Sequence, residues 1–467
     1  MQIPIVNGIY TDNAPSARIS YPVNLTPVIQ PNGVSNGFLR PSDGILLEAQ
    51  GPGVDRGGII WNDTHYRVMG TKLVSVTEAG AIATLGDVGG SGQVSIDYSF
   101  DRLCVVSSGN AYLWDGSSLV QITDPDLGVV HSVKWVDGYF MFTDGEFLIV
   151  SELLDPTSID PLKYGSAEID PDVVQSVQKI RNEAHAVGRH TIEVYRNIGG
   201  TGFPFQRIQG AQIQKGAVGI NAVCKFDDES LAFVGGGRNE PVGVYFGYNG
   251  TFQKISSREI DELLNGYTDL QLSNVVIEFR TDRNSRMLYV HCADRCLVFD
   301  AEASKAMGTL VWHVLTSGVG GFSTYRARNF TFYRGKYWVG DPTTSNLGTL
   351  TGDVGSQWGD VVRWEFGTQI IYNESRGAIF NELELVALTG SVAQGVSPVI
   401  STSYSEDGQN WSQDKEIAAG GIGDRLKRLV WRRQGIMRSM RMQRFRGDSQ
   451  SHISFLRLDA QFVALNR

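Results

Sequence analysis

The chain has few charged residues, few cysteines and no long apolar run. Charged residues make up 19% of its 467 residues, below the roughly 25% of typical globular chains. Four cysteines are too few for a disulfide scaffold in a chain of this length, so we expect reduced thiols. No stretch approaches the about 18 apolar residues of a spanning helix, and MQIPIVNGIY lacks the features of a secretory signal. We expect assembly in the cytoplasm and no membrane span.

Sequence signatures of catalysis are also missing. There is no G-x-x-x-x-G-K-[ST] phosphate loop, no H-E-x-x-H zinc motif and no G-x-S-x-G nucleophile elbow. The run from His291 to Cys296, HCADRC, has no second ligand pair that would complete a tetrahedral zinc site. Because Cys292 and Cys296 flank a predicted hairpin turn, we interpret them as small buried thiols that face each other across the strands. The sequence predicts no enzyme, no metal and no cofactor.

Glycine, by contrast, is abundant, with 54 residues. It occurs in turns between short runs that alternate apolar and polar residues, which indicates an all-β protein. The segment 94–122 shows the pattern best, with expected strands at 94–98, 103–107, 111–114 and 119–122. Comparable units begin near residues 58, 94, 132, 176, 220, 275 and 322. Four antiparallel strands in each unit of about 40 residues predict a β-propeller of six or seven four-stranded blades.

Three regions are expected. Residues 1–45 are rich in proline, asparagine and glycine and predict an extended N-terminal arm. Residues 46–360 form the predicted propeller, and residues 361–467 a C-terminal β-rich, sandwich-like domain. One helix is predicted after the fifth unit, with Ser256 as N-cap, Glu259 three residues later and Gly266 at its end.

Two propeller activities remain as alternatives to a structural role. A glycoside hydrolase would need convergent acids, and the run Asp227-Asp228-Glu229 occupies a predicted turn between strands, where acids are usually solvated. A carbohydrate-binding propeller would use exposed aromatic residues, with Trp61, Trp114, Trp135 and Trp338 as candidates. A cellular scaffold of the WD type should repeat its Trp-Asp pair in each blade, but the pair occurs once.

One segment is strongly basic. Residues 425–446 contain nine basic residues and no acidic one, which leaves 32 basic against 50 acidic residues elsewhere. We expect two strands joined near Gln434-Gly435. An edge strand needs only one or two protective charges, and arginine suits partly desolvated interfaces. The segment therefore predicts a docking surface for an acidic protein partner, with a plain solvated face and DNA binding as alternatives. The candidate docking residues are Lys427, Arg428, Trp431, Arg432, Arg433, Arg438, Arg441, Arg444 and Arg446.

Several segments carry a family resemblance. They are LGDVGGSGQVSI (85–96), QKGAVGINAVCKFDDESLAFVG (214–235), EIDELL (259–264), RCLVFDA (295–301) and RLVWRRQGIMRSMRMQRFR (428–446), with YPVNLTPV and GFLRPSDGI near the start. In order and spacing they are similar to the packaged-DNA stabilisation proteins (tail accessory, tail hub or nozzle proteins) of short-tailed bacteriophages, or podoviruses. The similarity extends over roughly residues 21–446.

This resemblance implies a structural virion protein of the phage tail. It implies a homo-hexameric ring below the portal and its adaptor, with contacts to the tailspike or tail fibre and to the tail needle or plug. The ring would close the DNA channel and retain packaged DNA until ejection. DNA would pass without sequence-specific binding, and the acidic balance outside the basic segment would suit such a channel because like charges repel.

Overall fold

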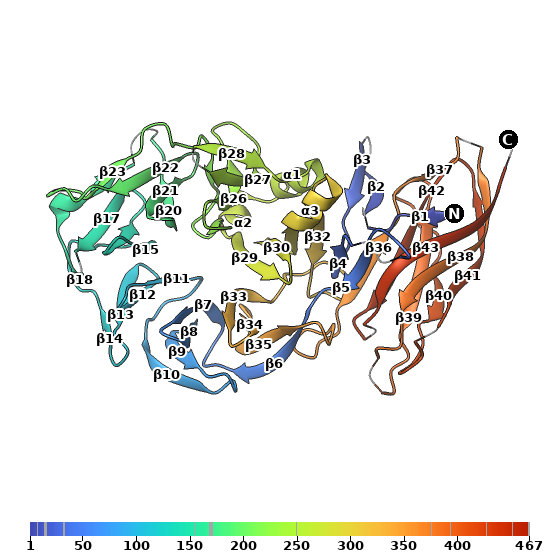
Figure 1. Cartoon of the computed structure of the whole chain (residues 1–467), viewed down its shortest axis with the longest axis horizontal. Helices are drawn as coiled ribbons and strands as arrows, with labels where there is room; N and C mark the ends of the chain where they lie inside the picture. Colours follow the sequence, from blue (N-terminus) through green and yellow to red (C-terminus); the bar gives the residue numbers. More distant parts are fainter. Residues whose placement is uncertain are drawn as a thin grey trace.

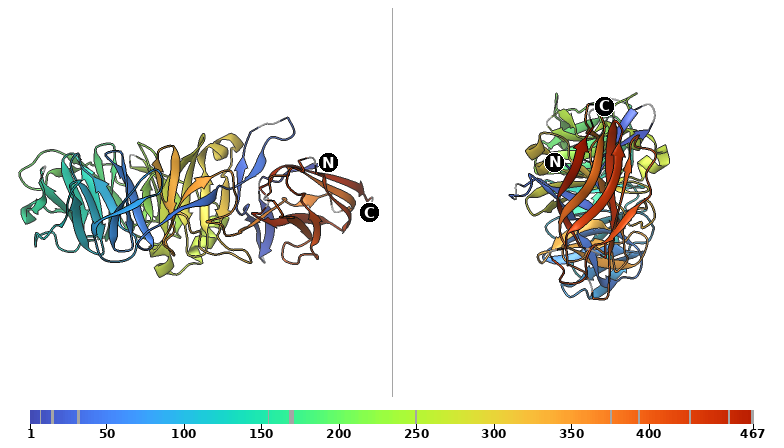
Figure 2. Two further views of the ribbon diagram at one scale, coloured as in Figure 1. Left: turned by 90° about the horizontal axis from the view of Figure 1, so that it is seen from below. Right: turned by 90° about the vertical axis from the view of Figure 1, so that its right-hand side faces the viewer.

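Seven sheets, five of four strands and two of five, follow one another along residues 44–351 and surround a common centre (Figure 1). The computed structural model describes residues 1–6, 8–13, 16–30, 33–153, 155–167, 171–248, 250–374, 376–392, 394–425, 427–450 and 452–465. A second, smaller β unit lies beside the propeller along the long axis, and both termini lie in it (Figures 1 and 2). The predicted all-β fold, a β-propeller followed by a β-sandwich, is confirmed.

The first four blades are built from consecutive strands, innermost strand first. Blade 1 contains β7 (Asp55–Trp61), β8 (Thr64–Met69), β9 (Lys72–Val76) and β10 (Ile82–Asp87). Blade 2 contains β11 (Ser95–Tyr98), β12 (Leu103–Ser107), β13 (Asn110–Trp114) and β14 (Leu119–Gln121). Blade 3 contains β15 (Ser132–Val136), β16 (Tyr139–Thr143), β17 (Phe147–Glu152) and β18 (Asp155–Ile159), with the short β19 (Gly165–Ser166) also on β17 after a 3-10 turn, Pro161–Lys163. Blade 4 contains β20 (Val174–Ile180), β21 (Glu183–Gly188), β22 (Ile192–Asn197) and β23 (Phe205–Arg207).

The last three blades contain two variations. Blade 5 starts with two short strands, β24 (Gly216–Ala217) and β25 (Val223–Lys225), followed by β26 (Leu231–Gly236), β27 (Gly243–Tyr248) and β28 (Thr251–Lys254). Blade 6 contains β29 (Val276–Asp282), β30 (Ser285–His291), β31 (Cys296–Asp300) and β32 (Trp312–Leu315). Blade 7 contains β33 (Arg328–Tyr333), β34 (Lys336–Gly340), β35 (Asn346–Thr351) and, as its outer strand, β6 (Gly44–Gln50). Each of the seven predicted units contains one blade, and β6 joins the start of the propeller to its end.

The seam between blades 7 and 1 is also held by a buried ion pair. Arg67 and Asp55 are almost completely buried, with Nε–Oδ1 and Nη2–Oδ2 distances of 2.7 Å. Both groups then reach blade 7: Arg67 donates to the carbonyl oxygen of Asn329 at 3.1 Å, and the Asn329 amide donates to Asp55 at 2.5 Å. These bonds satisfy two charges that would otherwise be costly to bury.

The predicted helix exists, but its N-cap is one residue later than expected. α1 (Arg258–Asn265) begins after Ser257, whose hydroxyl accepts the Ile260 amide N–H at 3.4 Å, and Gly266 ends it as predicted. Ser256 is not the N-cap, because its hydroxyl is engaged by the Val244 N–H and by Asp261. Two further short helices, α2 (Asp269–Ser273) and α3 (Ala301–Met307), were not predicted.

The C-terminal unit is a sandwich of two sheets. The first sheet contains β4 (Leu25–Val28), β5 (Phe38–Pro41), β43 (Ser454–Ala464), β38 (Ala378–Leu388) and β41 (Leu429–Met437), with β1 (Gln2–Ile3) added to β43. The second contains β36 (Arg363–Gly367), β42 (Met440–Asp448), β39 (Val399–Ser405) and β40 (Lys415–Ala418), with β37 (Ile371–Tyr372) added to β42. Aromatic side chains fill the space between them, with Phe366 in ring contact with Trp364, Phe445 and Phe455.

The N-terminal residues join both units. Three of their strands, β1, β4 and β5, are hydrogen-bonded into the sandwich, and the buried Leu25 and Leu39 belong to its core. A hairpin of β2 (Ile9–Asn13) and β3 (Ser16–Ser20) precedes β4. The predicted region boundaries at residues 45 and 360 stay predictions.

Candidate functional site

The two basic strands do not form the hairpin that we expected at Gln434-Gly435. β41 continues through this position and pairs with β38 in the first sheet, whereas β42 pairs with β36 and β39 in the second. The chain crosses between the sheets at Arg438-Ser439. Near Gly435 the β38–β41 register is interrupted by a bulge, and Arg433 has φ +55°. Bulges re-aim side chains, and few arginines adopt a left-handed conformation without a local reason.

Two of the nine candidate docking residues lie inside the sandwich. Trp431 is 2% exposed and Arg441 is 0% exposed. The Arg441 guanidinium donates to Gln443 Oε1 and to the carbonyl oxygen of Gln434, and it lies 3.9 Å from the Tyr404 ring centroid. Burial lowers the pKa of Arg441 to about 10, because it outweighs the opposing effect of Tyr404 and Glu406. These two residues support the sandwich from within and cannot contact a partner directly.

Four more of the candidates have partners within the sandwich. Arg428 makes bonds of 2.8 and 2.6 Å to Glu384, and Arg432 lies 3.5 Å from Glu382. Arg446 contacts Asp414 at 2.5 Å, and the Arg444 guanidinium stacks 3.9 Å from the Trp411 ring centroid. The acidic residues of β38 therefore neutralise part of the charge that the sequence concentrates here.

The remaining candidates are Lys427, Arg433 and Arg438. All three are exposed, and within the described part of the chain their side chains have no carboxylate partner. Two exposed apolar residues, Ile436 (52% exposed) and Val463 (54%), lie at the same end of the sandwich. They lie close to each other because both pair with Ile379 on β38, one from each side. We call Arg433, Ile436, Arg438 and Val463 the sandwich tip. It combines cations with apolar surface, as protein interfaces do.

The innermost strands of the seven blades surround a central channel. Residues of every blade line a space of about 430 Å³ inside it, for example Gly57, Lys134, Gln178, Glu278 and Asn329. This volume is in the range of small-molecule pockets, about 300–1,000 Å³.

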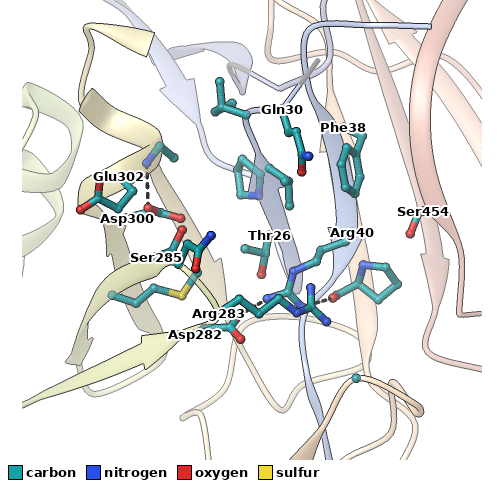
Figure 3. A pocket seen from close by; sticks show the side chains of 18 of the residues that line it. Thr26, Gln30, Phe38, Arg40, Asp282, Arg283, Ser285, Asp300, Glu302 and Ser454 are labelled. Atoms are coloured by element: carbon teal, nitrogen blue, oxygen red, sulfur yellow. Dashed lines mark hydrogen bonds and ion pairs between the residues drawn. The ribbon is translucent and has the colours of Figure 1, made fainter. Parts of the chain in front are cut away.

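The junction of the propeller and the sandwich is the third polar region. The Asn24 amide donates to the carbonyl oxygens of Thr316 (2.9 Å) and Arg363 (2.7 Å), which belong to the segments that follow β32 and begin β36. Close by, a cleft of about 630 Å³ separates α3 and the β29–β30 hairpin from β4, β5 and β43 (Figure 3).

Four charged side chains beside this cleft join β5 to blade 6. Arg40 pairs with Asp43 at 2.9 Å and with Asp282, and Arg280 pairs with Asp43 at 2.9 Å (Figure 3 shows Arg40 and Asp282). Burial raises the pKa of the Asp43 carboxyl, but Arg280 and Arg40 outweigh burial and hold that pKa at about 2. Asp43 is therefore ionised at neutral pH, and its ion pairs with Arg40 and Arg280 link the two units.

The residues considered for carbohydrate chemistry are poorly placed for it. Trp61, Trp114 and Trp338 are at most 5% exposed and pack within the blades, so three of the four candidate sugar platforms cannot stack on a ligand. Asp227 closes the β25–β26 turn by accepting backbone N–H groups. The hydrogen bond from Lys225 lowers the pKa of Asp228, whereas a general acid needs a raised pKa.

The HCADRC run forms the β30–β31 turn, as predicted. Cys292 and Cys296 are buried free thiols, but they are not opposite each other across the strands as predicted: Cys296 pairs with His291, and the Cys292 N–H donates to the Arg295 carbonyl oxygen at 2.8 Å. Burial raises the pKa of Cys292 to about 12. Within the described residues no group of three or more His, Cys, Asp or Glu side chains is arranged to hold a metal ion, and no helix is long and apolar enough to cross a membrane.

Comparison with known proteins agrees with this architecture. A family model described as Bacteriophage P22 Gp10, beta-propeller, matches residues 1–355, and a second, Bacteriophage P22 Gp10, beta-sandwich, matches residues 363–463. The tail hub protein gp10 of Salmonella phage P22 is 26% identical over 461 residues, which cover 94% of each chain.

Solved structures of other propellers are similar at a lower level. The WD40 domain of Neurospora crassa Pan2 is 9% identical over 64% of this chain and 89% of its own, with a TM-score of 0.42. A virginiamycin B lyase from Staphylococcus aureus is 11% identical over 66% of this chain and 99% of its own, with a TM-score of 0.43. Likenesses this weak do not bear on function. Because the two family models match most of the chain, the protein belongs to the phage P22 Gp10 family of tail hub proteins and is a structural component of the phage virion tail.

Proposed function

We propose that this protein forms a closed ring of six copies that docks under the portal–adaptor complex, closes the DNA channel and retains packaged DNA until ejection. In this arrangement the tailspike or tail fibre and the tail needle or plug are further neighbours. The protein acts as a structural part and not as an enzyme. The family membership supports the tail hub role, and the geometry of the sandwich supports a specific docking surface.

The sandwich tip is the observation that carries the docking proposal. Arg433 and Arg438 are exposed cations without carboxylate partners among the described residues, and Ile436 lies between them in the sequence. Residues 361–467 contain 14 basic and 11 acidic residues, a net charge of +3, so residues 1–360 carry −12. An acidic patch on the adaptor would gain charge-assisted contacts at the tip and orient the hub.

The path of DNA follows from the proposed ring. In a ring of six copies, DNA would pass through the centre, between subunits. The net charge of −12 on residues 1–360 would keep the duplex from adhering to that wall, because DNA binding depends on neutralising phosphates with cations. A lumen lined by basic residues would contradict this part of the proposal.

Native mass spectrometry of the full chain, alone and mixed with a portal–adaptor complex, tests the assembly. We expect six copies to join each complex. Arg433→Glu and Arg438→Glu should each weaken this association by at least tenfold, because each reverses a charge at the interface. Lys305→Glu, an exposed lysine on α3, is the matched control and should assemble as the wild type does.

The outcomes separate the two parts of the proposal. If all three variants join the complex normally, the sandwich tip is not the adaptor-docking surface, although the hexameric role stands. If the wild-type protein ignores the portal–adaptor complex, the assembly itself is wrong.

A further inference from the structure

One mouth of the propeller channel is a second open surface, distant in sequence from the sandwich tip. It encloses about 1100 Å³ and is lined by residues of five consecutive blades, 1 to 5. In each blade these residues lie at the C-terminal end of the innermost strand or in the turn that follows it. We call this surface the channel mouth and define it by Tyr98, Phe100, Lys134, Trp135, Lys179 and Lys225. Lys134, Gln178 and Lys225 line both the mouth and the channel below it.

Aromatic side chains at the channel mouth are unusually exposed. Phe100 is 94% exposed and Tyr98 is 42% exposed. The turn that carries Phe100 is well fixed, because the Ser99 hydroxyl accepts the Arg102 backbone N–H at 3.0 Å. Trp135 is partly buried, and the Lys179 ammonium lies 4.8 Å from its ring centroid. A large apolar side chain held in solvent by an ordered turn contributes nothing to the core, and such side chains are typical of binding surfaces.

The charge of the channel mouth is opposite to that of the propeller around it. Three of the 11 lysines in the chain, Lys134, Lys179 and Lys225, come from consecutive blades and line the mouth together with Arg181. Two carboxylates also line it, and both have partners: Asp97 accepts the Trp135 backbone N–H at 2.8 Å, and Asp228 contacts Lys225 at 2.7 Å. Four cations against two carboxylates leave the mouth net positive, within residues 1–360 of net charge −12.

We propose that the channel mouth binds an acidic segment of a partner protein, with an apolar side chain of that segment packed on Phe100 and its carboxylates beside Lys134, Lys179 and Lys225. The volume favours a peptide segment, since small-molecule sites enclose about 300–1,000 Å³. Four cations against two carboxylates attract an anionic segment, and the exposed Tyr98 and Phe100 offer contact to its apolar side chains. This site goes beyond the proposed tail assembly and uses none of the residues of the sandwich tip.

Fluorescence anisotropy with the full-length protein tests the proposal. The probe is a fluorescein-labelled twelve-residue peptide that alternates glutamate or aspartate with phenylalanine. The expected result is saturable binding that weakens with salt, because the contacts are partly ionic. Phe100→Ser and the double variant Lys179→Glu, Lys225→Glu should each weaken binding at least tenfold. Leu270→Ser and Lys305→Glu, which alter an exposed leucine on α2 and an exposed lysine on α3, should change it less than twofold.

Three results would overturn the proposal. They are no binding of the acidic peptide by the wild-type protein, equal loss in the control variants, and tighter binding of a labelled thymidine 20-mer or of a lysine–phenylalanine peptide. Phe100→Ser removes a side chain that is almost fully exposed, so the variant should fold. A thermal unfolding measurement on the variant checks this. None of these results alters the native-mass test of the hexamer, which concerns the sandwich tip.

Discussion

Asn24 and Thr316 bind each other reciprocally across the junction of the two units. The Asn24 Nδ2 donates to the Thr316 carbonyl oxygen at 2.9 Å, and the Thr316 N–H donates back to the Asn24 Oδ1 at 3.0 Å. The same Asn24 amide reaches Arg363, at the start of the sandwich, at 2.7 Å. One side chain from the N-terminal residues therefore joins the segment after β32 of blade 6 to β36 of the sandwich.

Replacing Asn24 should destabilise the junction. Asn24→Gly leaves the Thr316 N–H and the Arg363 carbonyl without this partner, whereas the Thr316 carbonyl keeps its bond from Gln357 at 3.3 Å. At roughly 1–3 kcal/mol for each unsatisfied group, the loss is about 2–6 kcal/mol. Asn24→Ala should cost about 1 kcal/mol more, because Asn24 has φ +51° and an alanine is strained there. Urea unfolding followed by tryptophan fluorescence measures both values. Wild-type stability in Asn24→Gly would show that these bonds do not hold the junction.

The buried pair Asp55–Arg67 should dominate the closure of the propeller. Asp55→Ala leaves the Arg67 charge buried and unpaired, and we expect a loss of about 3–5 kcal/mol in unfolding free energy. The double variant Asp55→Ala, Arg67→Met removes both charges and should recover part of that loss. A double-mutant cycle by urea unfolding measures the coupling. Additive losses in the two single variants would contradict a direct interaction.

The cluster around Asp43 predicts a stability that decreases in acid. The pKa of Asp43 is about 2 in the folded protein and about 3.9 in an unfolded chain, so the unfolded state binds more protons between these values. The contribution is complete above pH 5, and about 1 kcal/mol of it is lost by pH 3. The stability difference between wild type and Asp43→Asn should therefore shrink between pH 5 and pH 3. A difference that stays constant with pH would contradict the assignment.

Three buried histidines predict a second loss of stability, at milder pH. Burial lowers the pKa of His65 to about 2, of His185 to about 4 and of His313 to about 3. Because an unfolded histidine has a pKa of about 6.5, unfolding takes up protons below that pH, and stability falls as the pH falls from 6.5 toward 4. Near pH 5.5 the slope of unfolding free energy should correspond to at least two protons, about 3 kcal/mol for each pH unit. Denaturant unfolding between pH 7 and 5 gives the slope, and a flat profile would contradict neutral buried histidines.

The repeated hairpins could be predicted from the sequence because the residues that determine each hairpin lie close together in the chain. Alternating apolar residues and turn glycines mark each strand within a few positions, so all seven units could be located. The run LGDVGGSGQVSI illustrates this: Gly89, Gly90 and Gly92 all have positive φ, as expected of a turn. The position of this turn depends on a distant residue. Arg56, 33 to 36 residues earlier in the sequence, donates to the carbonyl oxygens of Gly89 (2.8 Å) and Gly92 (2.6 Å).

The candidate site was readable only in part. The concentration of arginine from residue 425 onward is visible in the sequence, but the burial of Trp431 and Arg441 is not. The residue pattern of a strand does not show which of its faces a second sheet will cover. The turn expected at Gln434-Gly435 was a bulge, because glycine serves both structures equally well. No pattern identified the channel mouth, which five blades form only when the ring is closed.

The sequence by itself determined the strand content, a repeat number of six or seven and the acidic and basic division of the chain, since these depend on residue type and short-range period. Only the tertiary structure decided that β6 completes blade 7, that β1, β4 and β5 belong to the sandwich, and that β41 and β42 lie in different sheets. Strand pairing between distant segments depends on which strand edges and apolar faces meet when the chain collapses. The alternation of residues within one strand does not specify which strand will pair with it or along which edge.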